Sequence, residues 1–423
     1  MNIPSLDECR DFLIRHEKIL AIAIIGYVFI STMIVDYVNN GWGDVNNYYR
    51  NASSVIDHHL MPYRDDVFEY PPFMMVFFII PKLLSYDIAS YHTSFFILST
   101  IFLVMNCILM VRITDRLPSS QHRTLFVIVS WMVFSNNFIF TRGDIFVSAM
   151  VLFGILLFLD KRYTTSSVLF ALATMTKLYP ILIFGVLMIS ILAKHENRTL
   201  IRSGVVFLLV CVLVELPFII ADASTAFDYL TYHSDRGLQI QSLISSVFLV
   251  YNVFVPGSVT VIKSHYSETI VNTVADAIAS YINELAILAM VLFCIWVITR
   301  LRKRSISQKE DAPLILVPAI VMLFITFSKV YSAQYLIWIA PLLILVVTDT
   351  IAPEERKRLL FAYLGLGLFT YIDETCTYGA LCNLEPIGVL VIVMKNLFHI
   401  ILMVLLMYTF YCHTRKDEVS PSR

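Results

Sequence analysis

The sequence has few charged residues: Lys, Arg, Asp and Glu together make up 15% of its 423 residues, whereas 58% are hydrophobic. A soluble globular protein cannot expose so much apolar surface to water, so this composition excludes an ordinary soluble fold. Neither sign of charge is in excess, because 31 basic residues nearly balance 32 acidic ones. The lack of a basic field argues against nucleic-acid binding. We therefore expect an all-α, polytopic membrane protein.

Several motifs of common chemistries are also absent. No Gly-rich phosphate loop follows a predicted strand, and no soluble segment is long enough for a nucleotide-sugar fold. The ten histidines show no HExxH or other zinc-ligand spacing. We expect no nucleotide site, no bound metal and no other cofactor. A cleavable signal peptide is not evident either, because the apolar run at residues 19–38 is long enough to span the bilayer.

Clusters of Lys and Arg predict the orientation of the chain. The positive-inside rule places such clusters in the cytoplasm. They occur at residues 112–123, 161–162, 194–202, 300–304, 356–358 and 415–416. Basic residues near the start of the chain put the N-terminus on the same side, so both termini are expected in the cytoplasm.

Apolar runs between these clusters predict about twelve spanning helices. They lie at residues 19–38, 92–112, 124–138, 144–160, 164–176, 179–193, 203–221, 283–300, 313–328, 335–349, 357–373 and 386–412. Two further segments do not fit this alternation. Residues 71–90 in the first outer loop (39–91) and residues 240–255 in the long outer loop (222–282) are expected to form interfacial or re-entrant helices.

The whole chain is expected to form one integral membrane domain. Residues 1–200 would carry the catalytic module, residues 201–345 the rest of a cavity, and residues 346–423 C-terminal spans without a motif. Cys376 and Cys382 fall in a short outer loop where an oxidising environment permits a disulfide. Their spacing alone does not fix the geometry, so a bridge and two free thiols both stay open.

Five polar segments are predicted to converge on the outer side of the membrane. The most unusual is residues 39–72, a polar, aromatic and acidic island directly after the first span. The others contain Asn136 to Asp144, Lys177 to Pro180, His233 to Ser242, and Lys329 to Gln334. A cavity built from them would hold carboxylates, cations and aromatic rings.

This combination suits sugar transfer from a lipid phosphate. A glycosyl phosphate already has a good leaving group, so the protein needs chiefly a carboxylate base for the acceptor hydroxyl and cations for the departing phosphate. Asp44 is the candidate base, because it lies just beyond the first span, near the membrane surface. The alternative is that Asp44 caps an amphipathic helix over residues 47–58, in which Tyr48, Ala52 and Val55 share a face.

Four cations on the same side are candidate phosphate ligands: Lys177, Arg142, Arg236 and Lys329. Lys177 is the strongest, because it interrupts an otherwise continuous apolar stretch. Each of the four has an alternative role as a cation at the end of a span that reaches into the lipid headgroups. Asp44 and Lys177 should flank a single water-filled chamber.

Other polar and aromatic residues in these segments are candidate sugar contacts. They are Tyr48, Tyr49, Tyr63, Asp65, Asp66, Tyr70, Tyr179, His233, Gln239 and Gln334. The tyrosines of the first loop fit an interfacial aromatic belt equally well. Asp65 and Asp66 with Glu69 offer oxygen ligands for a divalent cation, but a solvated turn next to prolines is the simpler interpretation.

The order of the motifs resembles a known family of enzymes. Asp44, Tyr48-Tyr49, Met61-Pro62-Tyr63 and Tyr70-Pro71-Pro72 look like the opening signature of C-type polytopic glycosyltransferases. The later blocks are Arg142-Gly143-Asp144, Thr176-Lys177-Leu178-Tyr179-Pro180, Arg236-Gly237-Leu238-Gln239-Ile240-Gln241-Ser242-Leu243, Phe327-Ser328-Lys329 and Ser332-Ala333-Gln334-Tyr335. Over residues 20–345 the chain is most similar to glycosyltransferase family 87. Its KLYP and Gln-Tyr blocks are also similar to the first mannosyltransferase of GPI-anchor synthesis.

The resemblance implies a C-type fold, with Asp44 at the catalytic position and Lys177 in the donor-binding region. It also implies an inverting, metal-independent transfer of mannose or another hexose from a polyprenyl-phosphate donor to a lipid- or glycan-linked acceptor, in a monomer surrounded by membrane lipids. Two departures bear on acceptor choice: Arg142-Gly143-Asp144-Ile145 replaces a common Gly-Gln-Val-Asn turn, and Ala333 replaces a frequent proline.

A secondary transporter or lipid flippase is the alternative from another class. Such proteins commonly show paired halves and interrupted helices near the bilayer midplane. No convincing repeat relates residues 1–200 to residues 201–423, and the acids lie in a loop rather than within a span. These observations favour the transferase.

Overall fold

The structure is a computed structural model, and it describes residues 26, 29, 42–232, 236–264, 267–302, 304 and 306–415. For residues 137 and 306–311 only the backbone is described. Most of the expected first span at 19–38 and the candidate sugar contact His233 lie outside the described residues.

Five helical segments within the described residues are long and apolar enough to cross a membrane. They are α5 (Ile88–Thr114), α11 (Asn197–Ala221), α14 (Thr273–Leu301), the continuous segment Pro353–Cys382, and α19 (Pro386–Arg415). Each has 25 to 30 residues, more than the ~20 that an apolar helix needs to span the hydrocarbon core. The expected all-α, integral membrane class is confirmed.

The remaining helices are shorter. They are α3 (Gly43–Ile56), α4 (Met74–Leu83), α6 (Gln121–Phe134), α7 (Asn136–Ile139), α8 (Asp144–Leu159), α9 (Tyr163–Thr174), α10 (Pro180–Ala193), α12 (Asp228–Thr231), α13 (Leu243–Phe254), α15 (Ile306–Thr326) and α16 (Leu336–Ile339). Helices α6, α8, α9 and α10 correspond to expected spans but have only 12 to 16 residues. The number of spans therefore stays a prediction.

The prediction of a single spanning helix over residues 335–349 is wrong. Residues 335–349 instead comprise the end of a 3₁₀ turn, η1 (Ala333–Tyr335), the short α16, a second 3₁₀ helix, η2 (Ala340–Leu345), and irregular backbone. Pro341 lies at the start of η2, where it has no backbone N–H to continue the preceding helix. The apolar composition of this run reflects burial inside the protein, since almost every residue in it is buried.

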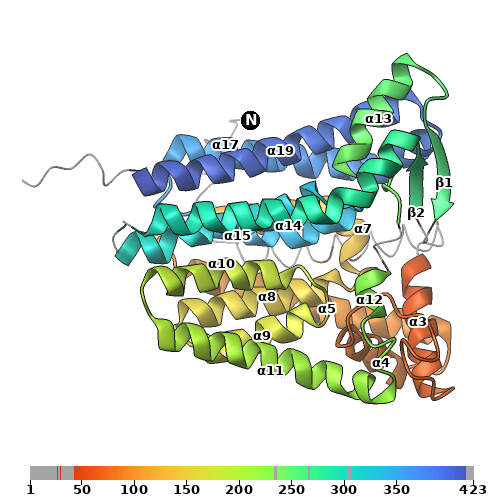
Figure 1. Ribbon diagram of the computed structural model, residues 1–423, viewed down its shortest axis with the longest axis horizontal. Coiled ribbons are helices and arrows are strands. Elements are labelled where there is room, and N and C mark those ends of the chain that lie inside the picture. The colour runs from red at the N-terminus through yellow and green to blue at the C-terminus, as the bar shows by residue number, and fades with distance from the viewer. Residues whose placement is uncertain are drawn as a thin grey trace, which may run out of the picture.

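The long helices lie alongside one another in layers (Figure 1). The segment that begins with α17 (Pro353–Ile372) packs on α19, which packs on α15, and α15 in turn contacts α10. Below α10, helix α9 packs between α8 and α11. The short elements α3, α4, α12 and α13 gather at one end of these layers, on the right of Figure 1.

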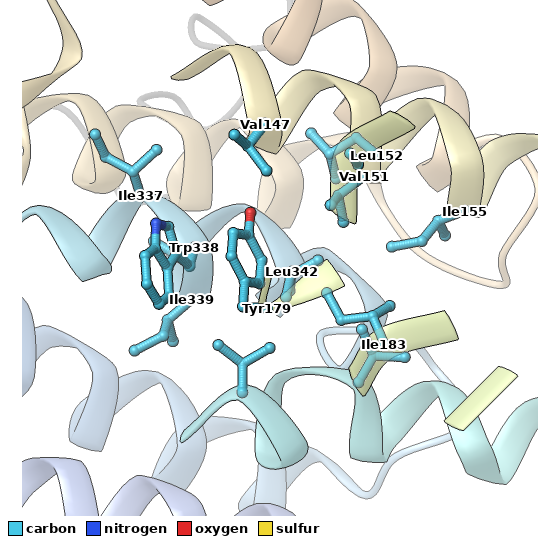
Figure 2. Packing of buried hydrophobic residues seen from close by; sticks show 14 of the residues in the cluster. Val147, Val151, Leu152, Ile155, Tyr179, Ile183, Ile337, Trp338, Ile339 and Leu342 are labelled. Atoms are coloured by element: carbon cyan, nitrogen blue, oxygen red, sulfur yellow. The ribbon is translucent and has the colours of Figure 1, made fainter. Parts of the chain in front are cut away.

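One part of the core contains buried residues of α8, α10 and the α16 region (Figure 2). Helix α8 is apolar around nearly its whole circumference, as expected for a helix enclosed by protein. Figure 2 shows its side chains against those of α10 and α16, including Val147, Val151, Ile183, Ile337 and Trp338. This packing fixes the ends of α8 and α10, where the polar residues of the site begin.

A small hairpin lies at the same end of the molecule as α13 (Figure 1). Strands β1 (Thr260–Ser264) and β2 (Ser267–Val271) pair antiparallel, and Gln239 forms an additional bridge with Thr269. Leu238 and Ile240 are buried in a cluster with Ile270 of β2. The segment 236–242 is therefore held against the hairpin rather than projecting as a loop.

The short outer loop expected after residue 373 is largely helical. A π-helical turn, η3 (Asp373–Thr377), continues α17 into α18 (Tyr378–Cys382). Cys376 and Cys382 are both free thiols in this segment. Their spacing permits either a disulfide or two free thiols, and the structure has two free thiols.

Candidate functional site

A cavity of about 580 Å³ lies where the short elements gather. Each of the five polar segments expected on the outer side contributes to its wall. The candidate residues that line it are Asp44, Tyr70, Arg142, Lys177, Tyr179, Arg236, Gln239, Lys329 and Gln334. Asp44 and Lys177, which lie far apart in the sequence, thus border one chamber.

The turn Arg142-Gly143-Asp144 connects the two sides of this site. Arg142 forms an ion pair with Asp44, while Asp144 forms an ion pair with Lys177 at 2.5 Å. Gly143 lies so close to α4 that an added Cβ would stand 3.0 Å from the Met74 methyl carbon. The absence of a side chain at this position lets the turn reach both partners.

Asp144 is buried, with 2% of its surface exposed, and lies at the centre of a polar and aromatic cluster. The indole N–H of Trp338 donates to the same carboxylate oxygen as Lys177. The Lys177 ammonium lies 5.0 Å from the Trp338 ring centroid, and the ring of Tyr179 stacks on Trp338 with centroids 4.4 Å apart. A buried carboxylate needs such donors, and in return it fixes Lys177 in the cavity wall.

Asp44 lies inside a helix rather than at its cap. Helix α3 begins at Gly43, so Asp44 is its second residue, and the predicted alternative of a cap for a helix starting near residue 47 is wrong. Asp44 and Asn47, three residues apart and therefore on one helix face, both line the cavity. The first turn of α3 thus presents a carboxylate to the chamber.

Helix α5 holds this first turn in place. The ring of Trp42 stacks on His92 with centroids 4.6 Å apart. The Nε2 atom of His92 lies 2.7 Å from the side-chain oxygen of Asn46. The first turn of α3, which carries Asp44, is therefore packed against α5. We expect the backbone at this position to stay in place when Asp44 is replaced by a residue of similar size.

The segment 236–242 and the segment around residue 329 are joined by hydrogen bonds. The backbone N–H of Gln239 donates to the carbonyl of Lys329 at 2.9 Å. The side-chain oxygen of Gln239 accepts from the backbone N–H of Tyr331 at 2.8 Å. These contacts bring Arg236 and Lys329 to the same cavity.

Gly237 is required by a close approach to β2. A Cβ at this position would lie 2.7 Å from the methyl carbon of Thr269, which is closer than real contacts allow. We expect Gly237→Ala to move the adjacent Arg236 in the cavity wall and to raise the KM for the substrate that the cavity binds several-fold. Steady-state kinetics would test this, with Gly204→Ala in α11 as the control, because a Cβ there meets nothing within 4 Å. Equal KM values for the two variants would contradict the assignment.

Within the part of the chain that the structure describes, five candidate sugar contacts do not line the cavity: Tyr48, Tyr49, Tyr63, Asp65 and Asp66. The Tyr48 ring stacks on Phe78 at 4.2 Å, and burial raises the pKa of its phenol above the usual value. Tyr63 is also buried and donates to the carbonyl of Tyr70. These two rings pack the first module, and neither lines the cavity.

The remaining three belong to the surface of the first loop. Hydrogen bonds from the Arg64 guanidinium and from the Met61 backbone N–H lower the pKa of Asp65 to about 2. Asp66 accepts from the Ser54 hydroxyl at 2.9 Å. The Tyr49 ring lies 5.0 Å from the Lys82 ammonium. Asp65 and Asp66 therefore lie in a turn that is stabilised by its own hydrogen bonds, and neither residue lines the cavity.

The cavity also contains residues that the sequence did not single out as site residues. Asn283, Glu374 and Tyr378 line it. Glu374 and Tyr378 lie beyond residue 345, where the sequence predicted C-terminal spans outside the cavity, so that boundary of the cavity is corrected. The available signal was the pair Asp373-Glu374 at the end of an apolar span, where two adjacent acids are unusual.

A helical membrane protein with a cavity of carboxylates, cations and aromatic rings at one end of its helices fits the class of polytopic glycosyltransferases. Comparison with known proteins agrees. Residues 68–265 match the sequence model of glycosyltransferase family 87. The chain is also similar to GPI mannosyltransferase 1 of Dictyostelium discoideum, with 25% identity over 348 residues that cover 76% of this chain and 75% of the relative. The predicted resemblance is confirmed, and the protein is a membrane glycosyltransferase.

Proposed function

We propose that the protein transfers mannose, or another hexose, from a polyprenyl-phosphate donor to a hydroxyl of a lipid- or glycan-linked acceptor. The observation that carries the proposal is the shared cavity of Asp44 and Lys177, linked through the Arg142-Gly143-Asp144 turn. We propose mannose as the sugar because the similar protein of Dictyostelium discoideum is a GPI mannosyltransferase.

In the proposed reaction, Asp44 acts as the general base. It accepts the proton of the acceptor hydroxyl as that oxygen forms a bond to the anomeric carbon of the donor sugar. The bond between this carbon and the phosphate oxygen breaks, and the phosphate leaves with the electron pair. A single displacement inverts the anomeric configuration and needs only one carboxylate base.

The cations have the complementary role of holding the phosphate. Arg236, Lys329 and Lys177 come from three different segments of the wall, so a phosphate among them would meet charge from several directions. We further propose a C-type fold of about twelve spans, with both termini in the cytoplasm and the cavity facing the exterior or lumen. Under this arrangement no nucleotide and no metal ion are required.

The proposal is tested by incubating the purified protein in vesicles with radiolabelled polyprenyl-phosphate mannose and membrane acceptor lipids. We expect labelled mannose to appear in a new lipid or glycan product with an inverted anomeric carbon. Movement of label across the vesicle membrane without a new glycosidic bond would favour a transporter or flippase and overturn the proposal.

A further inference from the structure

A buried ion pair lies behind the cavity, in the part of the chain without motifs. Lys395 of α19 contacts Asp373 of η3 at 3.4 Å, and both side chains are fully buried. Moving two charges from water into the protein interior costs free energy, and apolar residues of similar volume often stabilise a fold equally well or better. A general contribution to stability therefore does not explain this pair. The same oxygen of Asp373 also accepts from the side-chain nitrogen of Gln241 at 2.7 Å.

The residue after Lys395 contacts the same segment. Asn396 donates to the hydroxyl of Ser246 at 2.6 Å and to the backbone carbonyl of Ser242 at 3.3 Å. Two consecutive side chains of α19 therefore hold residues 241–246, one through Asp373 and one directly. These residues directly follow Arg236 and Gln239, which line the cavity wall.

Helix α19 also reaches the second cationic segment. The Lys395 ammonium lies 4.4 Å from the ring centroid of Tyr331, and His399, one turn further along, lies 3.0 Å from the Tyr331 hydroxyl. The backbone of Tyr331 is in turn bonded to Gln239. A single helix thus contacts two of the segments that contribute cations to the site, the one that carries Arg236 and the one that carries Lys329.

We propose that Lys395 is a positioning residue for glycosyl transfer: it orients Asp373, which fixes Gln241 and with it the donor-binding segment 236–242. This inference rests on the proposed function, because it assigns the segment to donor binding. The same contact also fixes the first residue of the π turn, so that Glu374 is presented to the cavity. Turns of this π type are frequent at functional sites.

Kinetics of Lys395 variants test the proposal. We expect Lys395→Met to raise the KM for polyprenyl-phosphate mannose about 10-fold, since misplacement of binding groups by about 1 Å can cost up to ~10²-fold. Lys395→Arg should restore a KM near that of the wild type. Thr409→Val is the control, because Thr409 is buried on the same helix about four turns beyond Lys395. A role in stability alone would lower the fraction of active enzyme, and hence kcat, without changing KM.

A double variant keeps the test valid if Lys395→Met fails to fold. In Lys395→Met/Asp373→Asn no charge is left unpaired, and the amide oxygen still accepts from Gln241. We expect an unfolding temperature close to that of the wild type together with a raised donor KM. A wild-type KM in this stable double variant would overturn the proposal.

Hydrogen exchange provides a measurement that does not depend on activity. The amides of Gln239, Ile240 and Tyr331 are bonded within the network, so they should exchange faster in Lys395→Met than in Thr409→Val. Unchanged exchange would overturn the positioning role. Absence of transfer by the wild-type protein would instead overturn the proposed function, which makes the two failures distinguishable.

Discussion

Replacing Asp44 by Asn is expected to lower kcat by about 10²–10⁴-fold, the usual contribution of a general base. The amide has the size of the carboxylate and still offers an oxygen to Arg142, and the first turn of α3 stays anchored on α5. Only the ability to take a proton is lost. The donor KM should therefore change little, which steady-state kinetics with polyprenyl-phosphate mannose would show.

Asp65→Asn is the matched control for this prediction. It makes the same chemical change in the same loop, but Asp65 contacts Arg64 and the Met61 backbone and does not line the cavity. We expect this variant to keep nearly full transfer activity. An Asp44→Asn enzyme as active as Asp65→Asn would exclude Asp44 as the base.

Sequence reasoning predicted the parts of the site that local pattern determines. Lys177 interrupts an apolar run, and the structure has the break there, between α9 and α10. Charge bias predicted which loops share one side of the membrane, and each segment predicted on the outer side contributes to one cavity. Such inferences are possible because a polar residue in a mostly apolar membrane protein is costly to place against lipid or in an apolar core, and therefore usually lies in a loop or a polar cavity.

Other parts of the site could not be predicted, because the order of residues in a short segment does not show which helix face points to the cavity or which distant residues are in contact. Tyr48 is one residue beyond Asn47, a rotation of about 100° in a 3.6-residue helix, and this turns it from the cavity to the core. Gln241 and Asp373 are 132 positions apart in the sequence. With no sequence signal for that contact, residues 346–423 were predicted only as C-terminal spans without a motif.

The pair of Asp144 and Lys177 allows stability and function to be separated. Asp144 is almost fully enclosed, whereas the Lys177 side chain is 17% exposed and also lies over the Trp338 ring. Loss of the lysine leaves an enclosed carboxylate without its counter-charge, but loss of the carboxylate leaves a cation with other favourable contacts. The two single substitutions should therefore differ in their effect on folding.

We expect Lys177→Met to lower the free energy of unfolding by about 3–5 kcal/mol, the range for breaking one side of a buried ion pair. Asp144→Asn should destabilise less, because the amide oxygen still accepts from Trp338. The double variant Lys177→Met/Asp144→Asn should recover most of the lost stability, since no buried charge is left unpaired. Denaturant unfolding in detergent would measure these differences.

Transfer activity should follow a different order. If Lys177 binds the donor phosphate, Lys177→Met and the stable double variant should both lose donor affinity by at least about 10-fold, the effect of one charge-assisted hydrogen bond. Asp144→Asn should keep more of it, because the ammonium remains in the cavity wall. Recovery of both stability and transfer in the double variant would show that Lys177 serves only to neutralise Asp144. Recovery of stability without transfer would leave phosphate binding as the function of this lysine.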